Sequence, residues 1–181
     1  MFLNKFSDWP NNKKIKQLLI FSVILLLVIY PIMSYFFTVS YPVSAFESQL
    51  SFSGELIKEY NTNADINLYK IANILDYFFI LSYGGISFSL GVIIARKFKE
   101  EIIWRKIGLI MIPLTIIAPS CDAIENIFIL LMLSDPLEFP NVWAIIHSFF
   151  ALLKYIIMFI GFGWIATALI YLVFIRKSHK I

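Results

Sequence analysis

Four long apolar stretches constrain the fold of this chain more than any other feature. They run approximately over residues 18–39, 71–95, 107–133 and 142–175. Each is long enough to cross the hydrocarbon layer of a membrane, which takes about 20 helical residues. Only 15% of the residues are charged, and these lie mostly between the stretches, whereas 60% are hydrophobic. The sequence therefore predicts an integral membrane protein rather than a soluble globular domain.

Helix is the form that we predict for the four spans. Unpaired backbone groups are too costly in lipid, and the strict alternation of a membrane β-strand is absent. We expect an all-α, four-helix transmembrane bundle that forms one membrane domain over residues 1–181. The alternative for the first stretch is a signal peptide, because Val43-Ser44-Ala45 resembles a cleavage site. The stretch is, however, longer than the apolar region of a usual signal peptide.

The segment between the first and second spans shows a weaker helical pattern. Phe46, Leu50, Leu56 and Ile57 recur at near-helical spacing among polar residues. This pattern predicts a short amphipathic helix lying on the outer surface, with an ordinary polar loop as the alternative. Asp65 is the predicted N-cap of the second span.

The basic residues predict the orientation of the chain. They gather before the first span, between the second and third, and after the fourth: Lys5, Lys13, Lys14, Lys16, Arg96, Lys97, Lys99, Arg105, Lys106, Arg176, Lys177 and Lys180. The other two loops carry few basic residues. By the positive-inside rule, we predict a plasma-membrane protein with both termini in the cytoplasm. The net charge of +3 comes from these loop clusters and gives no nucleic-acid signal.

Five ionisable residues lie inside the predicted spans, where such residues are rare and usually face the bundle interior. They are Asp76, Asp122, Glu125, His147 and Lys154, and Asn73, Asn126, Tyr77 and Tyr83 accompany them. At about 1.5 Å of rise per residue, all five fall in the outer half of the membrane or near its midplane. Spacings of three, four and seven residues place them on one face of each of three helices. We predict that these polar faces meet.

The charge count of this site is unbalanced. Three carboxylates face one lysine and one histidine, which leaves an excess of about two negative charges when His147 is neutral. Such an excess is not tolerated in a low-dielectric interior, so either a carboxyl group holds a proton or a cation or water enters. The alternative is a structural role, in which Lys154 pairs with Asp122 or Glu125 and fixes the helix packing.

Motifs of established chemistry are missing from the sequence. There is no HExxH, no GxSxG and no phosphate-binding glycine loop, and the single Cys121 excludes an intrachain disulfide and a CxxC metal site. The site residues Asp76, Asp122, Glu125 and His147 include metal-ligand types, but their pattern is unspecific. We predict no metal and leave the cofactor open.

Proline and glycine mark expected irregularities in the spans. Pro113 and Pro119 each remove a backbone donor, which predicts a kink in the third span. Small residues allow helices to approach closely in membranes, and this is expected for Gly84, Gly85, Gly161 and Gly163.

Three short motifs lie in the second to fourth spans. They are Leu75-Asp76-Tyr77-Phe78-Phe79 followed by Tyr83, Asp122-Ala123-Ile124-Glu125-Asn126, and Leu153-Lys154-Tyr155. They resemble the LDxxF motif with a later tyrosine, the DxxEN motif and the lysine followed by an aromatic residue of a family of uncharacterised bacterial and archaeal four-span membrane proteins. The resemblance covers roughly residues 45–160 and implies the same site residues without naming a chemistry. His147 is not part of the family pattern.

Two function classes fit these predictions. The first is a small membrane enzyme acting on a lipid or isoprenoid, with Asp76, Asp122 or Glu125 as general acid or base and Lys154 tuning them. The second is a module that binds or transports a cation, a proton or an amphipathic ligand. Its ligand-binding residues would include Asn73, Tyr77, Tyr83, Asn126 and His147. The plainer alternative is an accessory subunit, and the oligomeric state stays open.

Overall fold

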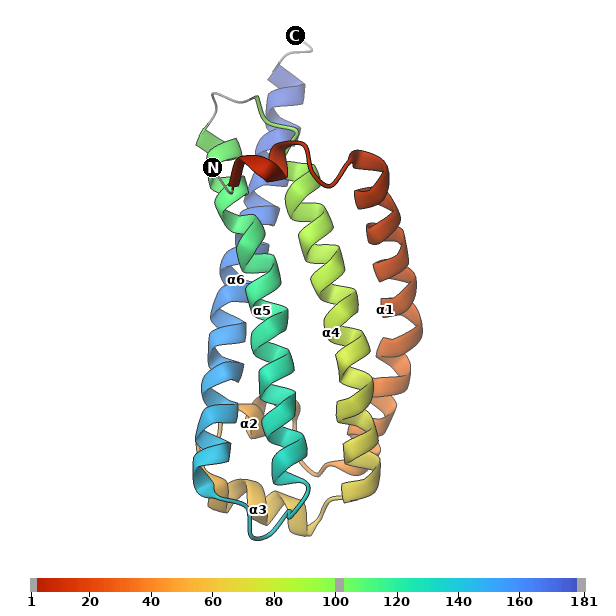
Figure 1. Cartoon of the computed structure of the whole chain (residues 1–181), viewed down its shortest axis with the longest axis vertical. Coiled ribbons are helices and arrows are strands. Elements are labelled where there is room, and N and C mark those ends of the chain that lie inside the picture. The colour runs from red at the N-terminus through yellow and green to blue at the C-terminus, as the bar shows by residue number, and fades with distance from the viewer. Residues whose placement is uncertain (1–2, 100–102, 179–181) are drawn as a thin grey trace.

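Four long helices form the body of the protein in the computed structural model (Figure 1). The structure describes residues 3–99 and 103–178, and it describes the side chains of residues 5–99 and 103–174. Of the basic residues that predict the orientation, Arg176, Lys177 and Lys180 therefore lie outside the described side chains. The elements are η1 (Leu3–Ser7), α1 (Asn12–Ser40), α2 (Ala45–Gln49), α3 (Gly54–Thr62), α4 (Ile66–Ala95), α5 (Ile103–Met132) and α6 (Asn141–Ser178).

The long helices α1, α4, α5 and α6 are each long and apolar enough to cross a membrane. The shortest has 29 residues, which at about 1.5 Å per residue exceeds the thickness of a hydrocarbon core. The predicted all-α fold with a four-helix transmembrane bundle is confirmed. The helix α5 continues through Pro113 and Pro119 as one element.

Local sequence signals start several of the helices. Asn11 caps α1 by accepting a hydrogen bond from the Lys14 backbone N–H at 2.9 Å. The predicted cap of α4 is confirmed, because the Asp65 carboxylate accepts the backbone N–H groups of Asn67 and Leu68 at 3.1 Å. Such caps satisfy amide groups that have no partner inside the helix.

The helices pack in chain order rather than as a closed ring. Helix α1 packs along α4, α4 along α5, and α5 along α6, whereas α1 and α6 do not pack along each other within the described residues. Two short helices, α2 and α3, lie at one end of the bundle (Figure 1). We call this end the α3 end, and the opposite end, where α1 begins, the η1 end.

Glycines mark the closest contacts between the helices, but only some of those predicted. A Cβ atom on Gly84 would lie 2.9 Å from Pro119 Cγ, and one on Gly85 would meet Ser22 of α1. The prediction is wrong for Gly161 and Gly163, because no neighbouring side chain lies within 4 Å of a Cβ atom at either position. Both glycines lie on α6, which packs mainly along one long helix, α5, whereas α4 packs along both α1 and α5.

The segment before α4 differs from the single amphipathic helix that the sequence predicts. It forms two helices, α2 and α3, with a break at Phe52, whose φ of 52° lies in the left-handed region. The apolar face of α3 is buried through Ile57, which packs in one cluster with Tyr69 of α4 and Phe139. The segment is thus anchored on the ends of the long helices.

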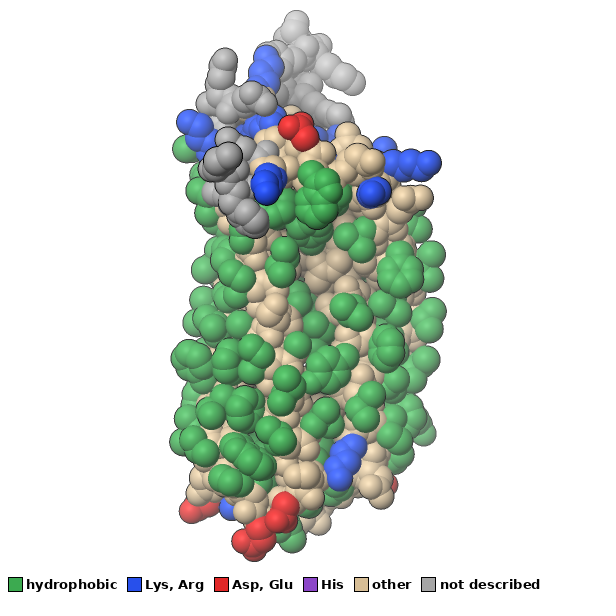
Figure 2. All heavy atoms as spheres, in the orientation of Figure 1, with side chains coloured by type: hydrophobic (Ala, Val, Ile, Leu, Met, Phe, Trp, Pro, Cys, Tyr) green, Lys and Arg blue, Asp and Glu red, His purple; other side chains and the backbone are tan. Residues whose placement is uncertain are grey.

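Charged side chains separate to the two ends of the molecule. Figure 2 shows most lysine and arginine side chains at the η1 end, most acidic side chains at the α3 end, and hydrophobic side chains between them. Large apolar side chains such as Leu27 and Phe159 are more than two-thirds exposed on this belt. An exposed apolar belt of this extent fits contact with lipid.

Candidate functional site

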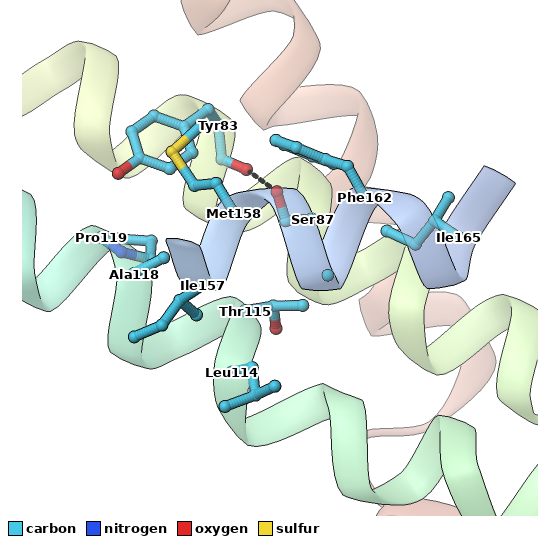
Figure 3. A pocket seen from close by; sticks show the side chains of 11 residues that line it. Tyr83, Ser87, Leu114, Thr115, Ala118, Pro119, Ile157, Met158, Phe162 and Ile165 are labelled. Carbon is cyan, nitrogen blue, oxygen red and sulfur yellow. Dashed lines mark hydrogen bonds between the residues drawn. The ribbon is translucent and has the colours of Figure 1, made fainter. Parts of the chain in front are cut away.

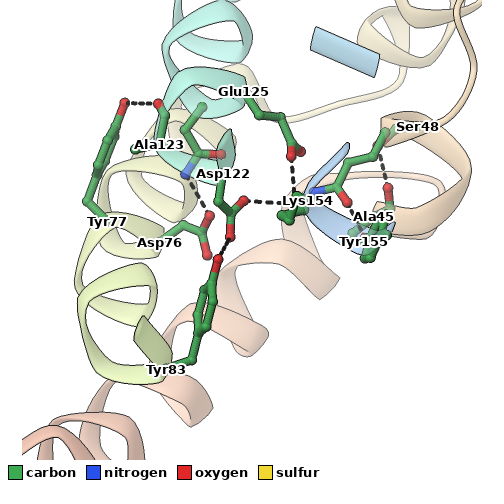
Figure 4. Close-up of polar contacts among 12 residues, drawn as sticks. Ala45, Ser48, Asp76, Tyr77, Tyr83, Asp122, Ala123, Glu125, Lys154 and Tyr155 are labelled. Carbon is green, nitrogen blue, oxygen red and sulfur yellow. Dashed lines mark hydrogen bonds and ion pairs between the residues drawn. The ribbon is translucent and has the colours of Figure 1, made fainter. Parts of the chain in front are cut away.

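The helix α5 presents one buried polar face. Asp122, Glu125 and Asn126 are 4% exposed or less, and their spacing of three and four residues turns them the same way. The Lys154 ammonium of α6 lies 2.8 Å from Asp122 Oδ1 and 2.6 Å from Glu125 Oε2. Dashed lines from Lys154 to both carboxyl groups mark these contacts in Figure 4. The structure therefore brings together three ionisable residues from the faces that the sequence predicts to meet.

Glu125 has Lys154 as its only polar contact among the described residues. Its Oε2 atom lies 2.6 Å from the ammonium, within ion-pair distance, and Oε1 has no hydrogen-bond partner. Because one lysine is shared by two carboxyl groups, it balances only one of their negative charges.

Helix α4 adds the third carboxyl group and a tyrosine. The Tyr83 hydroxyl donates to Asp122 Oδ2 at 2.8 Å (Figure 4), and Asn126 Nδ2 donates to Asp76 Oδ2 at 2.6 Å. We call the six residues that these contacts join the polar cluster: Asp76, Tyr83, Asp122, Glu125, Asn126 and Lys154. Within it, the partner of Asp76 is a neutral amide rather than a cation.

Two predicted site residues lie apart from the cluster. The Tyr77 hydroxyl donates to the backbone carbonyl of Ala123 at 3.2 Å and bridges α4 and α5 away from the cluster (Figure 4). His147 is 2% exposed on α6, and its Nδ1 atom has no hydrogen-bond partner. Neither residue lines the cavity described next.

A cavity of about 320 Å³ lies beside the polar cluster. Its polar lining comes from α2, α4, α5 and α6: Ser48, Gln49, Asn73, Asp76, Tyr83, Asp122, Asn126 and Lys154. The apolar side includes Met33 and Phe37 of α1 and Met158 of α6. Sequence reasoning missed the contributions of α1 and α2, since these uncharged residues carry no signal that sets them apart from ordinary packing residues.

Asn73 lies one turn before Asp76 on α4 and is fully buried. Its Nδ2 group donates to the Tyr69 backbone carbonyl at 2.8 Å, which leaves Oδ1 to face other partners. The Tyr69 hydroxyl lies near the Asn73 side chain, but it makes no hydrogen bond to this oxygen. A buried carbonyl oxygen without a donor is unusual, and this one belongs to a residue that lines the cavity.

Aromatic rings form a large part of the cavity wall near α3. The rings of Tyr41 and Tyr69 stack with centroids 4.0 Å apart, and Phe37 meets Tyr69 edge-on at 5.7 Å. Tyr41 directly follows α1, and burial raises the pKa of its hydroxyl well above the ordinary value, with Tyr69 and Tyr60 adding to the effect. The hydroxyl stays protonated and donates to Asn61 Oδ1 at 3.4 Å.

The helix α2 covers the cavity at the α3 end and is tied to α6. The Tyr155 hydroxyl donates to Gln49 Oε1, and the Phe46 ring lies 5.6 Å from the Tyr155 ring. After α2, the Phe52 backbone N–H donates to Ser148 Oγ at 3.1 Å. These contacts hold the cover in place over Lys154, whose ammonium lies 4.9 Å from the Tyr155 ring centroid.

Toward the η1 end the interior is nearly closed. A second space of about 20 Å³ lies between α4, α5 and α6 (Figure 3), and Tyr83 and Met158 line both spaces. The remaining wall is mostly apolar, with Leu114 and Ile157 among its residues. This volume holds about one water molecule, so the large cavity does not continue toward the η1 end as an open path.

Neither metal chemistry nor known relatives identify the site. Among residues 3–99 and 103–178, no three His, Cys, Asp or Glu side chains come together in a group that could hold a metal ion. No protein-family model, curated protein or solved structure matches the chain. The arrangement itself is therefore the basis for function: an acid-rich pocket with one lysine, an aromatic wall and an apolar side.

Proposed function

We propose that this membrane protein binds the cationic head group of an amphipathic molecule in the cavity beside the polar cluster. The observation that carries the proposal is the charge of the cavity wall. Asp76 and Asp122 line it, and Lys154, the one cationic side chain among the described residues that line it, already contacts both Asp122 and Glu125. A ligand cation would supply the charge that the described side chains lack.

Asp76 is the carboxyl group best suited to receive the cation. Its described partner is the Asn126 amide, which satisfies one oxygen without balancing the charge. A charge in a poorly solvated place is costly unless an opposite charge or several hydrogen bonds accompany it. A cationic group placed in the cavity next to Asp76 would provide that partner and would also lie near the aromatic wall, which attracts cations through the ring faces.

The apolar side of the cavity supports an amphipathic ligand rather than a free ion. Met33 and Phe37 of α1 and Met158 of α6 line it, and these two helices do not pack along each other in the described part of the chain. An apolar tail could lie between α1 and α6 and reach the lipid. Ligand pockets typically combine an apolar wall with a few placed polar groups in this way.

We further propose that the α3 end faces the outside of a plasma membrane and that both termini are cytoplasmic. The basic side chains at the η1 end support this orientation through the positive-inside rule (Figure 2). The ligand would then enter from the outer leaflet. Membership of the four-span family with LDxxF, DxxEN and lysine–aromatic motifs stays a proposal as well.

Binding can be tested with three probes that share one alkyl chain. The purified protein in lipid nanodiscs would be mixed with dodecylamine, dodecyltrimethylammonium or dodecanol, and bound ligand counted by native mass spectrometry. We expect at least one cationic probe to bind more than tenfold better than the neutral alcohol, and Asp76→Asn to remove this preference. Glu138→Gln is the matched control, because Glu138 is exposed at the α3 end outside the cavity. Equal binding of all three probes would overturn the proposal.

A second candidate function is acid–base catalysis on a lipid or isoprenoid. The observation that favours it is the pairing on Asp122, whose two carboxylate oxygens contact the Tyr83 hydroxyl and the Lys154 ammonium while the residue faces the cavity. Such a chain of groups suits proton transfer at a bound substrate. Comparing the lipids of cells that express the protein or its Asp122→Asn variant would test this function. A lipid that changes only with the unaltered protein supports it, and identical lipid profiles argue against it.

A further inference from the structure

We infer that the head group is a primary amine carrying N–H donors and a net positive charge, as in a long-chain amine or amino alcohol, rather than a quaternary ammonium. This inference rests on the proposed function and narrows it. It depends on Asn73, an uncharged residue that does not contribute to the charge of the cavity.

Asn73 and Asp76 form a pair of hydrogen-bond acceptors at the cavity. They are three residues apart on α4, so they share one helix face, and both line the cavity. The Asn73 amide nitrogen is committed to the Tyr69 carbonyl, which fixes the side chain with Oδ1 free of any donor. The site thus presents two hydrogen-bond acceptors, the Asp76 carboxylate and Asn73 Oδ1, to a ligand that carries hydrogen-bond donors.

The missing donor distinguishes between two kinds of cation. An ammonium group with three N–H bonds can give one to Asp76 and one to Asn73 Oδ1, whereas a quaternary ammonium has none to give. A buried acceptor that stays without a donor loses its hydration without compensation. The aromatic wall attracts both kinds of cation, so Asn73 is the residue expected to discriminate between them.

The charge of the site also separates two sources of an amine. Phosphatidylethanolamine carries a primary amine, but its phosphate would bring a negative charge toward Asp76, Asp122 and Glu125. Like charges held close together in a poorly solvated site repel. The inference therefore commits to an amphiphile whose head group has no phosphate.

The experiment is a competition in nanodiscs made of phosphatidylcholine. Dodecylamine, dodecyltrimethylammonium and a short-chain phosphatidylethanolamine would be present at equal concentration, and bound ligand would be counted by native mass spectrometry. We expect dodecylamine to exceed each competitor by about tenfold or more. Because this result needs no variant, it does not depend on whether an altered protein folds.

Variants of the protein test whether Asn73 causes the preference for dodecylamine over dodecyltrimethylammonium. Asn73→Ala should reduce the ratio of dodecylamine to dodecyltrimethylammonium toward one, while Asp76→Asn should weaken both cations. Ser89→Ala is the matched control, because Ser89 is fully buried on α4 but does not line the cavity, and it should leave the ratio unchanged.

Each outcome bears on one of the two proposals. Equal binding of the two alkyl cations, with loss in Asp76→Asn, would overturn the amine inference and leave cation binding intact. A preference for phosphatidylethanolamine would also overturn it, since the phosphate would then be tolerated. Binding of every probe without any effect of Asp76→Asn would overturn the proposed function as well.

Discussion

The two halves of the bundle are built from the same four apolar helices but use them in opposite ways. At the η1 end, small and aromatic residues close the interior, and Gly108 lies directly beneath Trp164 and Ala95. At the α3 end, buried carboxyl, amide and ammonium groups accompany a cavity of about 320 Å³. The difference between the two ends shows that hydropathy determines where the chain spans the membrane, whereas the few buried polar residues determine where a cavity remains between the helices.

In the half of the bundle at the α3 end, polar side chains keep the helices apart, because each buried polar group needs a hydrogen-bond or ion-pair partner. Lys154 of α6 donates a hydrogen bond to Asp122 of α5, and Asn126 of α5 donates one to Asp76 of α4, so hydrogen-bond lengths set the spacing of these helices. In the η1 half, Val92 and Ile112 have no such requirement and are fully buried in one apolar cluster. Tight packing is the default in such a cluster.

The first prediction tests which half faces outward, and its effect is all or none. In a background with Cys121→Ala, a cysteine replacing Asn63 should react with a membrane-impermeant maleimide added outside cells, and one replacing Lys99 should not. The reason is the excess of basic residues at the η1 end. Labelling of the Lys99 position alone would reverse the assignment of the two halves.

The second prediction removes the cation of the α3 half. Lys154→Met should cost about 3–5 kcal/mol in the free energy of unfolding, because Asp122 and Glu125 lose the partner that they share. Reversible unfolding by sodium dodecyl sulfate in mixed micelles measures this energy. Lys106→Met, at an exposed position near the start of α5, is the control and should stay within about 0.5 kcal/mol. Equal costs for the two variants would mean that the cluster does not depend on its lysine.

The third prediction probes the closed half. Gly108→Ala should cost about 1–3 kcal/mol, because the new Cβ atom would lie 2.8 Å from Ala95 Cβ and 2.6 Å from Trp164 Cζ2. Gly161→Ala is the control, with no neighbouring side chain within 4 Å, and should be neutral or slightly stabilising. The same unfolding measurement applies. If both variants were neutral, the η1 half would be looser than this packing indicates.

The sequence predicted the spans and the polar faces well, for a physical reason. Charge and hydropathy are local properties, so Asp122 and Glu125 on one helix face and Lys154 on another already indicated a buried contact. The cavity could not be predicted, because it depends on Met33, Phe37 and Gln49, which carry no such signal. The glycines show the same limit: Gly85 and Gly161 look alike in sequence, and only the neighbouring helix distinguishes them.

The hydrogen-bond partners of individual polar residues likewise could not be predicted from the sequence. Tyr77 and Tyr83 both follow Asp76 on α4, yet the hydroxyl of Tyr83 donates to Asp122 and that of Tyr77 donates to a backbone carbonyl. Six residues separate them along a helix of about 3.6 residues per turn, so they turn to different faces. The sequence predicts a single polar face for α4, but the direction of each hydroxyl depends on which groups of α5 lie opposite it.

The last prediction uses these two tyrosines as a matched pair and has the smallest expected effect. Tyr83→Phe should cost about 1 kcal/mol in unfolding free energy, because Asp122 Oδ2 loses its buried donor at 2.8 Å while Lys154 still balances the charge. Tyr77→Phe removes a longer bond of 3.2 Å at a partly exposed position and should cost less than about 0.5 kcal/mol. A larger cost at Tyr77 would show that contacts outside the cavity, rather than the polar cluster, hold α4 and α5 together in this half.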